Sequence, residues 1–388
     1  MRDIGVVTVA RSDFGCYLPV LREIEKHPNL RTRLLVSGTH LSPEFGLTIR
    51  DIEDEGFCAD ERIEMSLSSD SPQGIAKSTG LGVASFAQVF ERVRPDILLV
   101  LGDRFEMLSA VVAAVPFNIP VAHIHGGELT YGVIDDVIRH SITKMSHLHF
   151  ASTEKSAARI VQMGEEPWRV TVSGAPTLDN LGTMELLDRE EVASRFALNL
   201  DSEFLLVNFH PVTLDYERTD VALAELLGAL EELAQPAIIT YPSADTQGHG
   251  IIDGSRILAS RDARFHVTPS LSPQGYWSLM KLAQAMVGNS SSGIIEAPSL
   301  GLPVVNIGDR QLGRERAPNV IDVAADKSHI VEATKRATSS DFRASLQGLQ
   351  NPYGDGHAAE KIVRRLAEEE NPELLIHKRF YEVGSSSS

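Results

Sequence analysis

Short hydrophobic runs alternate along the chain with longer segments in which apolar residues recur at helical spacing. The runs are mostly apolar throughout, as in strands that are buried on both faces of a parallel sheet. They predict strands at 4–9, 33–37, 97–102, 121–124, 148–151, 170–173, 204–209, 237–241, 265–267, 285–288 and 304–307. The amphipathic segments predict helices at 17–27, 74–94, 137–145, 154–163, 185–196, 221–233 and 357–369.

This alternation predicts an α/β protein with two doubly wound sheets, because strands that alternate with helices form parallel βαβ units. A Gly- and Pro-containing segment at 173–180 interrupts the pattern. We therefore predict one Rossmann-like domain over residues 1–175 and a second over 176–370. The helix at 357–369 is expected to pack back on the first domain, and residues 371–388 form a tail to which we assign no role.

Composition narrows the functional classes mainly by exclusion. The 36 Lys and Arg against 53 Asp and Glu give a net charge of −17, which disfavours binding to nucleic acid or to anionic membranes. Two cysteines are too few for a disulfide framework or a CxxC zinc module. Neither a signal peptide nor an apolar stretch of roughly 18 residues is evident, so we expect a cytoplasmic protein.

Ligands of such sheets bind beyond the carboxyl ends of the strands, so the polar residues that follow each strand are the candidates. Arg11 lies in a small polar turn that is suited to a phosphate, although by itself this signal is weak and a plain turn with Asp13 as N-cap is favoured. This turn is not GxGxxG, so we predict no nicotinamide or flavin cofactor. Asp103 is either an N-cap or a catalytic carboxylate, and Arg104 pairs with it or with a substrate phosphate.

The densest polar cluster follows the strand at 121–124 and reads His-Ile-His-Gly-Gly-Glu over 123–128. Its imidazole and carboxylate groups suit general acid–base chemistry, and its two glycines allow the backbone to approach a ligand. The spacing is not that of HExxH, so we predict no metal site. The structural interpretation is that Asp135 or Asp136 caps the helix at 137–145 and that His123 and His140 are interior groups. We expect it to hold for His123, for His140 and for at least one of the two Asp residues.

The second half carries its own candidates. His210 ends a strand before Pro211 and should face the ligand crevice. Ser290, Ser291 and Ser292 precede a helix and form an anion site, unless they simply cap that helix. Arg310 belongs to a basic loop at 308–316 that either binds a diphosphate or is solvated.

Together these motifs resemble the hydrolysing UDP-N-acetylglucosamine 2-epimerases of bacterial sialic acid and legionaminic acid synthesis. The resemblance covers nearly the whole chain and is carried by GDRFE (102–106), HIHGGE (123–128), IDD and RHSITKMSHLHF (134–150), NFHP (208–211), GNSSSGIIEAPSLGLPVVNIGDRQ (288–311) and NPYGDG (351–356). It implies a GT-B-like fold, with the nucleotide in the cleft between the two domains, and a homodimer.

The resemblance also implies a mechanism that needs neither metal nor redox cofactor. A base removes the C2 proton, UDP leaves from C1 to give a 2-acetamidoglucal, and water adds to release free N-acetylmannosamine. By motif, Asp103 and Asp135 resemble the catalytic carboxylates of the family, and His210 resembles its imidazole near the leaving group. The residues that resemble its nucleotide contacts are Arg11, Ser290, Ser291, Glu296 and Arg310.

One departure from the family pattern affects the acid–base assignment. Some relatives read HIEGGE where this chain reads HIHGGE, so either His125 takes the role of that Glu or Glu128 does. We favour Glu128, with His125 assisting. Two other functions remain open: a GT-B glycosyltransferase and a noncatalytic nucleotide-sugar sensor. The substrate is UDP-N-acetylglucosamine or a 2,4-diacetamido-6-deoxy analogue, with GDP as the alternative nucleotide.

Overall fold

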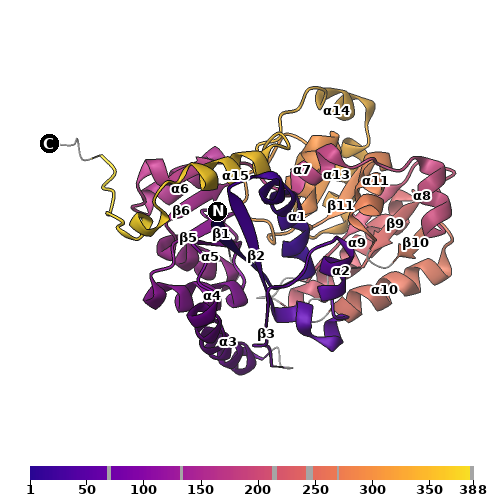
Figure 1. The fold of residues 1–388 in the computed structure, drawn as a ribbon. Helices are drawn as coiled ribbons and strands as arrows, with labels where there is room; N and C mark the ends of the chain where they lie inside the picture. Colours follow the sequence, from indigo (N-terminus) through magenta and orange to yellow (C-terminus); the bar gives the residue numbers. More distant parts are fainter. Residues whose placement is uncertain (68–70, 132–133, 212–215, 242–247, 269–270, 385–388) are drawn as a thin grey trace. The chain divides into compact units, whose positions relative to one another are not determined.

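The computed structural model describes residues 1–67, 71–131, 134–211, 216–241, 248–268 and 271–384. The chain divides into two compact units (Figure 1). Unit 1 comprises Met1–Leu129, Ile134–Asn180 and Tyr353–Ser388, and unit 2 comprises Thr130–Val133 and Leu181–Pro352. The chain thus passes from unit 1 to unit 2 at Asn180, whereas the sequence pattern placed the division near residue 175. The last serines of the predicted tail, at 385–388, lie outside the described residues.

The sheet of unit 1 is entirely parallel and has the order β3-β2-β1-β4-β5-β6-β7. Its strands are β1 (Arg2–Thr8), β2 (Leu30–Ser37), β3 (Glu61–Ile63), β4 (Ile97–Leu101), β5 (Val121–Ile124), β6 (Leu148–Ala151) and β7 (Val170–Val172). The sequence pattern missed β3, because this short edge strand carries a Glu and an Arg and is not an apolar run.

Helices connect the strands of unit 1, and further helices of this unit follow its last strand along the chain. They are α1 (Arg11–Lys26), α2 (Ile49–Asp54), α3 (Pro72–Arg92), α4 (Phe105–Ala114), α5 (Ile134–Met145), α6 (Glu154–Gln162) and α15 (Ala358–Glu368), and α7 (Thr177–Thr183) runs across the division. The sequence pattern missed α4 because most of its residues are buried, so it lacks an amphipathic period.

Short 3₁₀ segments occur in both units. They lie at Gly38–Leu41, Pro43–Phe45, Val115–Phe117, Pro167–Arg169, Ala297–Leu300 and Pro372–Ile376.

Unit 2 repeats the design with a parallel sheet in the order β10-β9-β8-β11-β12-β13. Its strands are β8 (Leu205–Asn208), β9 (Ala237–Thr240), β10 (Phe265–Thr268), β11 (Ala285–Gly288), β12 (Val304–Ile307) and β13 (Val320–Val323). Its helices are α8 (Arg189–Phe196), α9 (Tyr216–Leu233), α10 (Gly248–Arg261), α11 (Pro273–Leu282), α12 (Ser292–Ile295), α13 (Lys327–Ala337) and α14 (Ser340–Ser345). The two doubly wound sheets confirm the predicted fold class.

Strand order reverses direction once in each sheet, between β1 and β4 in unit 1 and between β8 and β11 in unit 2. Such a switch point opens a crevice at the carboxyl ends of the two strands, because the following helices lie on opposite faces of the sheet. Asp103 follows β4, and Ser290 follows β11. Each unit therefore places predicted site residues where its topology creates a binding crevice.

The C-terminal helix belongs to the core of unit 1. Ile362, Val363 and Leu366 of α15 are buried in the same hydrophobic cluster as Val20 and Ile24 of α1, and the two helices lie side by side (Figure 1). Burying a large aliphatic side chain contributes about 1.5–3 kcal/mol, so α15 is an integral part of this unit. Within the part of the chain that the structure describes, no helix has the length and apolar character needed to cross a membrane.

Candidate active site

Asp103 lies at the switch point of unit 1, directly beyond β4. Gly102 turns the chain there with a φ of +75°, a left-handed conformation that favours glycine. The Asp103 side chain is 25% exposed and forms an ion pair with Arg139 of α5, whose side chain is only 2% exposed. The turn therefore leaves the carboxylate accessible while a buried cation holds it in place.

Arg139 also holds the loop that carries the HIHGGE motif. Its Nη1 donates to the backbone oxygen of Glu128 at 3.1 Å and lies 3.6 Å from Asp136 Oδ1. Burial acts to lower the pKa of Arg139, but the charges of Asp103, Glu128 and Asp136 raise it above its ordinary value. The guanidinium thus stays charged. Sequence analysis assigned no role to Arg139, because it lies on a helix and not at the end of a strand.

His125 and Glu128 form a direct pair. Nδ1 of His125 lies 2.6 Å from Glu128 Oε1, and the two side chains are 12% and 6% exposed. The backbone bends sharply to achieve this: His125 has a φ of +63°, and Gly127 has a φ of +74°. A Cβ on Gly127 would lie 2.4 Å from the backbone oxygen of Ser156, so only glycine fits there. The loop thus brings the two candidate acid–base groups together.

His123 is a structural histidine, as the sequence predicted. It is fully buried, its Nε2 donates to the backbone oxygen of Gly102 at 2.7 Å, and its Nδ1 accepts from Thr143 Oγ1 at 3.2 Å. Burial lowers its pKa to about 3, so the imidazole is neutral at physiological pH. The same prediction is wrong for His140, whose side chain is 27% exposed and lies 3.5 Å from Asp136 Oδ2.

Two capping predictions in unit 1 are also wrong. Helix α5 begins at Ile134, so Asp135 and Asp136 lie inside its first turn, where carboxylates interact favourably with the helix dipole. Asp135 is exposed at this position. Asp13 lies within α1, for which Ala10 is the N-cap, and its carboxylate accepts from the backbone N–H groups of Val9 and Ala10.

The two predicted basic contacts of unit 1 have acidic neighbours. Arg11 is exposed at the start of α1, and its Nε lies 3.2 Å from Asp51 Oδ2 on α2. Arg104 lies 3.1 Å from the buried carboxylate of Glu106 and forms an ion pair with it. A bound phosphate at either arginine would therefore compete with a carboxylate.

In unit 2, Asn289 joins the ends of β8 and β11. Its side-chain oxygen accepts from the backbone N–H of His210 at 2.7 Å, and its Nδ2 donates to the backbone oxygen of His210 at 2.9 Å. Burial and the nearby charge of Arg310 lower the pKa of His210 to about 3. Among the described residues, no group is bound to His210 Nδ1. This neutral imidazole therefore keeps unused hydrogen-bonding capacity.

The predicted serine cluster forms a hydroxyl network that is anchored by Tyr276. Ser292 Oγ lies 2.9 Å from Ser290 Oγ and 2.7 Å from Tyr276 Oη. Asn208 Nδ2 donates to Tyr276 Oη at 3.2 Å, and burial raises the pKa of this phenol to about 12, so it keeps its proton. Ser291 is the residue before α12, but its side chain makes no capping hydrogen bond, so simple N-capping does not explain it.

Arg310 and Gln311 extend toward the same loop. Arg310 Nη1 and Gln311 Nε2 donate to the backbone oxygen of Asn289 at 3.1 and 2.9 Å. Glu296 is partly buried at the C-terminal end of α12 and acts electrostatically on Tyr276. Sequence analysis missed the roles of Asn289, Tyr276 and Gln311. Asn289 and Gln311 both lie within the motif at 288–311, so attention to the side-chain amides of that motif could have identified them.

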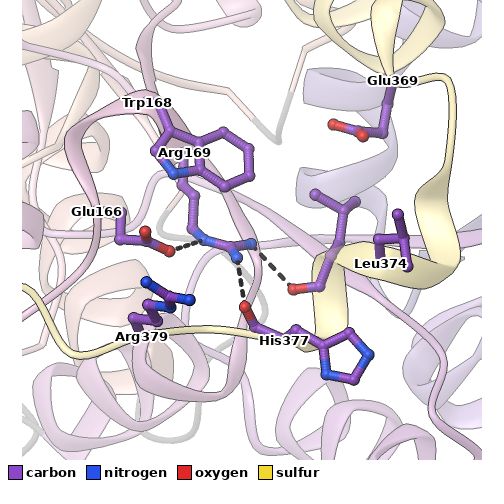
Figure 2. A pocket seen from close by; sticks show the side chains of 8 residues that line it. Glu166, Trp168, Arg169, Glu369, Leu374, His377 and Arg379 are labelled. Carbon is purple, nitrogen blue, oxygen red and sulfur yellow. Dashed lines mark hydrogen bonds and ion pairs between the residues drawn. The ribbon is translucent and has the colours of Figure 1, made fainter.

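Unit 1 also contains a cavity of about 250 Å³ (Figure 2). It is lined by Glu166, Trp168, Arg169, Glu369, Leu374, Leu375, His377 and Arg379. The buried Arg169 donates to Glu166 Oε2 and to the backbone oxygens of Leu375 and His377, and so fastens the C-terminal segment (Figure 2). No predicted site residue lines this cavity. Within the described ranges, no cluster of three or more His, Cys, Asp or Glu side chains is suited to a metal ion.

A family model described as UDP-N-acetylglucosamine 2-epimerase matches residues 22–367. The chain belongs to this 2-epimerase family. It is 37% identical to the GDP/UDP-N,N'-diacetylbacillosamine 2-epimerase (hydrolyzing) of Campylobacter jejuni, over 98% of this chain and 99% of that protein. It is 34% identical to the UDP-N,N'-diacetylbacillosamine 2-epimerase (hydrolyzing) of Legionella pneumophila, over 94% and 96% of the two chains.

The fold of this 2-epimerase agrees with solved structures of the family. The UDP-GlcNAc 2-epimerase of Neisseria meningitidis, solved with bound UDP-GlcNAc, superposes with a TM-score of 0.83 at 22% identity. The match covers 95% of this chain and all of that one. The protein is therefore an enzyme of the hydrolysing 2-epimerase class with two Rossmann-like domains. This assignment favours the epimerase over the glycosyltransferase and the sensor that the sequence motifs had left open.

Proposed function

We propose that this 2-epimerase converts a UDP-linked 2,4-diacetamido-6-deoxy sugar to its free 2-epimer and UDP, through a 2-acetamidoglucal. The observation that carries the substrate class is the similarity over nearly the full chain to two enzymes named for N,N'-diacetylbacillosamine, at 37% and 34% identity. A second candidate is UDP-N-acetylglucosamine, because a Neisseria meningitidis enzyme named for that substrate is 33% identical over 87% of the chain. The released sugar would be a precursor of legionaminic or sialic acid.

The acid–base groups of the proposed reaction lie in unit 1. Removal of the C2 proton and protonation of the glucal each require a positioned acid or base. Asp103 is accessible and held by Arg139, and His125 and Glu128 form a buried pair. Asp135 is exposed in the first turn of α5 and is the second carboxylate that the family resemblance assigns. We assign proton transfer to these four residues.

The nucleotide contacts of the proposed reaction lie mainly in unit 2. A departing diphosphate needs preorganised donors and positive charge. The Ser290 and Ser292 hydroxyls are ordered by Tyr276, and Arg310 adds a guanidinium beside them. The neutral imidazole of His210 can donate a hydrogen bond to the leaving oxygen without carrying a charge that would hold UDP after cleavage. The remaining assigned contacts are Ser291, Glu296, Arg11 and Arg104.

The proposed function is tested by incubating the enzyme with the UDP- and GDP-linked forms of both sugars and following the products by NMR. In deuterated water, the released sugar should carry deuterium at C2, because the proton that the base removes exchanges with solvent before the new C2–H bond forms. Activity should persist in EDTA without added metal or nicotinamide. A product without solvent label, or activity that is lost in EDTA and restored by a divalent ion, would contradict the mechanism.

We expect Arg310→Ala to weaken UDP binding by about 1.5–3 kcal/mol, the scale of a charge-assisted hydrogen bond. Calorimetric titration with UDP measures this directly. Arg316→Ala is the matched control, because Arg316 lies in the same basic loop but is paired with Asp322 at 2.7 Å. Equal UDP affinity in the Arg310 variant and the parent would remove Arg310 from the nucleotide site.

We also propose, from the family resemblance, that the enzyme is a cytoplasmic homodimer that needs no cofactor. Sedimentation velocity at several protein concentrations tests the dimer, and cell fractionation tests the location.

A further inference from the structure

The His125–Glu128 pair has a third member, which the sequence motifs did not include. Ser152 directly follows β6, next to the strand β5 that leads into His125. Its Oγ lies 2.6 Å from Glu128 Oε1, the same atom that lies 2.6 Å from His125 Nδ1. Ser152 is 1% exposed, so this contact is fully shielded from water.

The contacts set the direction of both hydrogen bonds. An ionised carboxylate only accepts, so the Ser152 hydroxyl and the His125 Nδ1–H must both donate to it. A neutral imidazole that carries its proton on Nδ1 has its free lone pair at Nε2. Glu128 Oε1, in contrast, already accepts two hydrogen bonds, so it is poorly placed to take up the substrate proton. Compared with Oε1 of Glu128, Nε2 of His125 is therefore the better placed basic atom.

We infer that Ser152 is a positioning residue that locks the Glu128 carboxylate, and that His125 moves the substrate proton through Nε2. The inference rests on the proposed function and reverses the roles that the sequence had favoured for this pair. It extends the family resemblance, which covered the HIHGGE loop but not the strand end at Ser152.

The loop around the pair is held firmly enough for this role. Arg139 binds the backbone oxygen of Glu128, and Arg159 of α6 binds that of Gly127. Together they hold His125 in its left-handed conformation, which is costly for a non-glycine residue and is typical of functional sites. Among the described residues, Arg139 interacts electrostatically with Glu128, Arg159 binds the loop backbone beside it, and the neutral His123 interacts with His125.

Ser152→Ala should lower kcat by about 10–100-fold, the cost of a slightly misplaced catalytic group, with KM nearly unchanged. Without the serine donor, Glu128 attracts the His125 proton more strongly. The pH of half-maximal kcat on the acid side should therefore rise by about 0.5–1. Ser152→Cys, which keeps the shape of the side chain but replaces the hydroxyl with a larger and weaker donor, should change kcat in the same direction. Ser173→Ala is the matched control, because this buried serine directly after β7 donates to backbone oxygens, those of Gly174 at 2.9 Å and Ala151 at 3.4 Å.

Two further measurements separate positioning from a general structural effect and from the proposed function. In a Glu128→Gln background, Ser152→Ala should have little additional effect, because Ser152 acts through Glu128. In the enzyme with ¹⁵N-labelled histidine and no substrate, the Nδ1-bound proton of His125 should be visible, and its resonance should shift in Ser152→Ala because its hydrogen bond to Glu128 becomes stronger. The inference would be overturned if Ser152→Ala had the kcat and the pH profile of the parent enzyme. It would also be overturned if Ser152→Ala lowered kcat as much in the Glu128→Gln background as in the parent. If the enzyme turned over none of the nucleotide sugars but the histidine spectra changed as expected, the proposed function would be overturned. The positioning role of Ser152 would then remain in place.

Discussion

Asp103→Asn should lower turnover by about 10²–10⁴-fold, the usual contribution of a general acid or base. The Asn side chain keeps an acceptor for Arg139, so the local geometry is retained while the proton-transfer group is removed. The free energy of unfolding should fall by about 1–3 kcal/mol, since the buried guanidinium loses one of its compensating charges. UDP affinity should change far less than turnover. The measurements are the rate of sugar release, calorimetric titration with UDP and urea unfolding.

Asp136→Asn is the matched control for this experiment. Asp136 lies 3.6 Å from the same guanidinium, and its side chain is 20% exposed, close to the exposure of Asp103. It loses the same charge beside Arg139 but has no assigned part in proton transfer. A comparable loss of turnover in both variants would show that Asp103 acts only by holding Arg139.

Glu165→Gln should produce a large loss of stability without a loss of chemistry. Glu165 is completely buried and accepts from Lys144 Nζ at 2.6 Å, His149 Nε2 at 3.1 Å and Lys378 Nζ at 2.9 Å. Burial alone would raise its pKa, but these three hydrogen bonds lower it to about 2. We expect the free energy of unfolding at pH 7 to fall by about 3 kcal/mol, because the amide leaves the two ammonium groups uncompensated.

The contribution of Glu165 to the free energy of unfolding should depend on pH in a definite direction. The depressed pKa means that the stability from Glu165 is fully present above about pH 4.5 and is lost as the pH falls toward about 2. The difference between the parent and Glu165→Gln should therefore narrow in acid, as measured by urea unfolding. Glu360→Gln, at an exposed pair with Arg364, should cost well under 1 kcal/mol. A constant difference across the pH range would contradict this role of Glu165.

The sequence determined the main architecture and the positions of the candidate site, because both depend on local patterns. Apolar runs predicted the central strands of both sheets, since strands buried on both faces carry few polar residues. The rule that ligands bind beyond strand ends then selected Asp103 after β4 and Ser290 after β11. The edge strands β3 and β13 escaped detection, because their partly solvated residues do not form apolar runs.

Only the tertiary structure decided which side chains work together. Arg139 meets Asp103 across 36 residues of sequence, and Ser152 meets Glu128 across 24. Asn289 likewise joins its loop to His210, which lies 79 residues earlier. Such pairs depend on which strands are neighbours, on the left-handed turn at His125 and on the side-chain rotamers. The periodic pattern of hydrophobic residues along the chain reports none of these features. The sequence therefore predicted where the candidate site lies, and the packing of distant segments showed how its side chains are held and oriented.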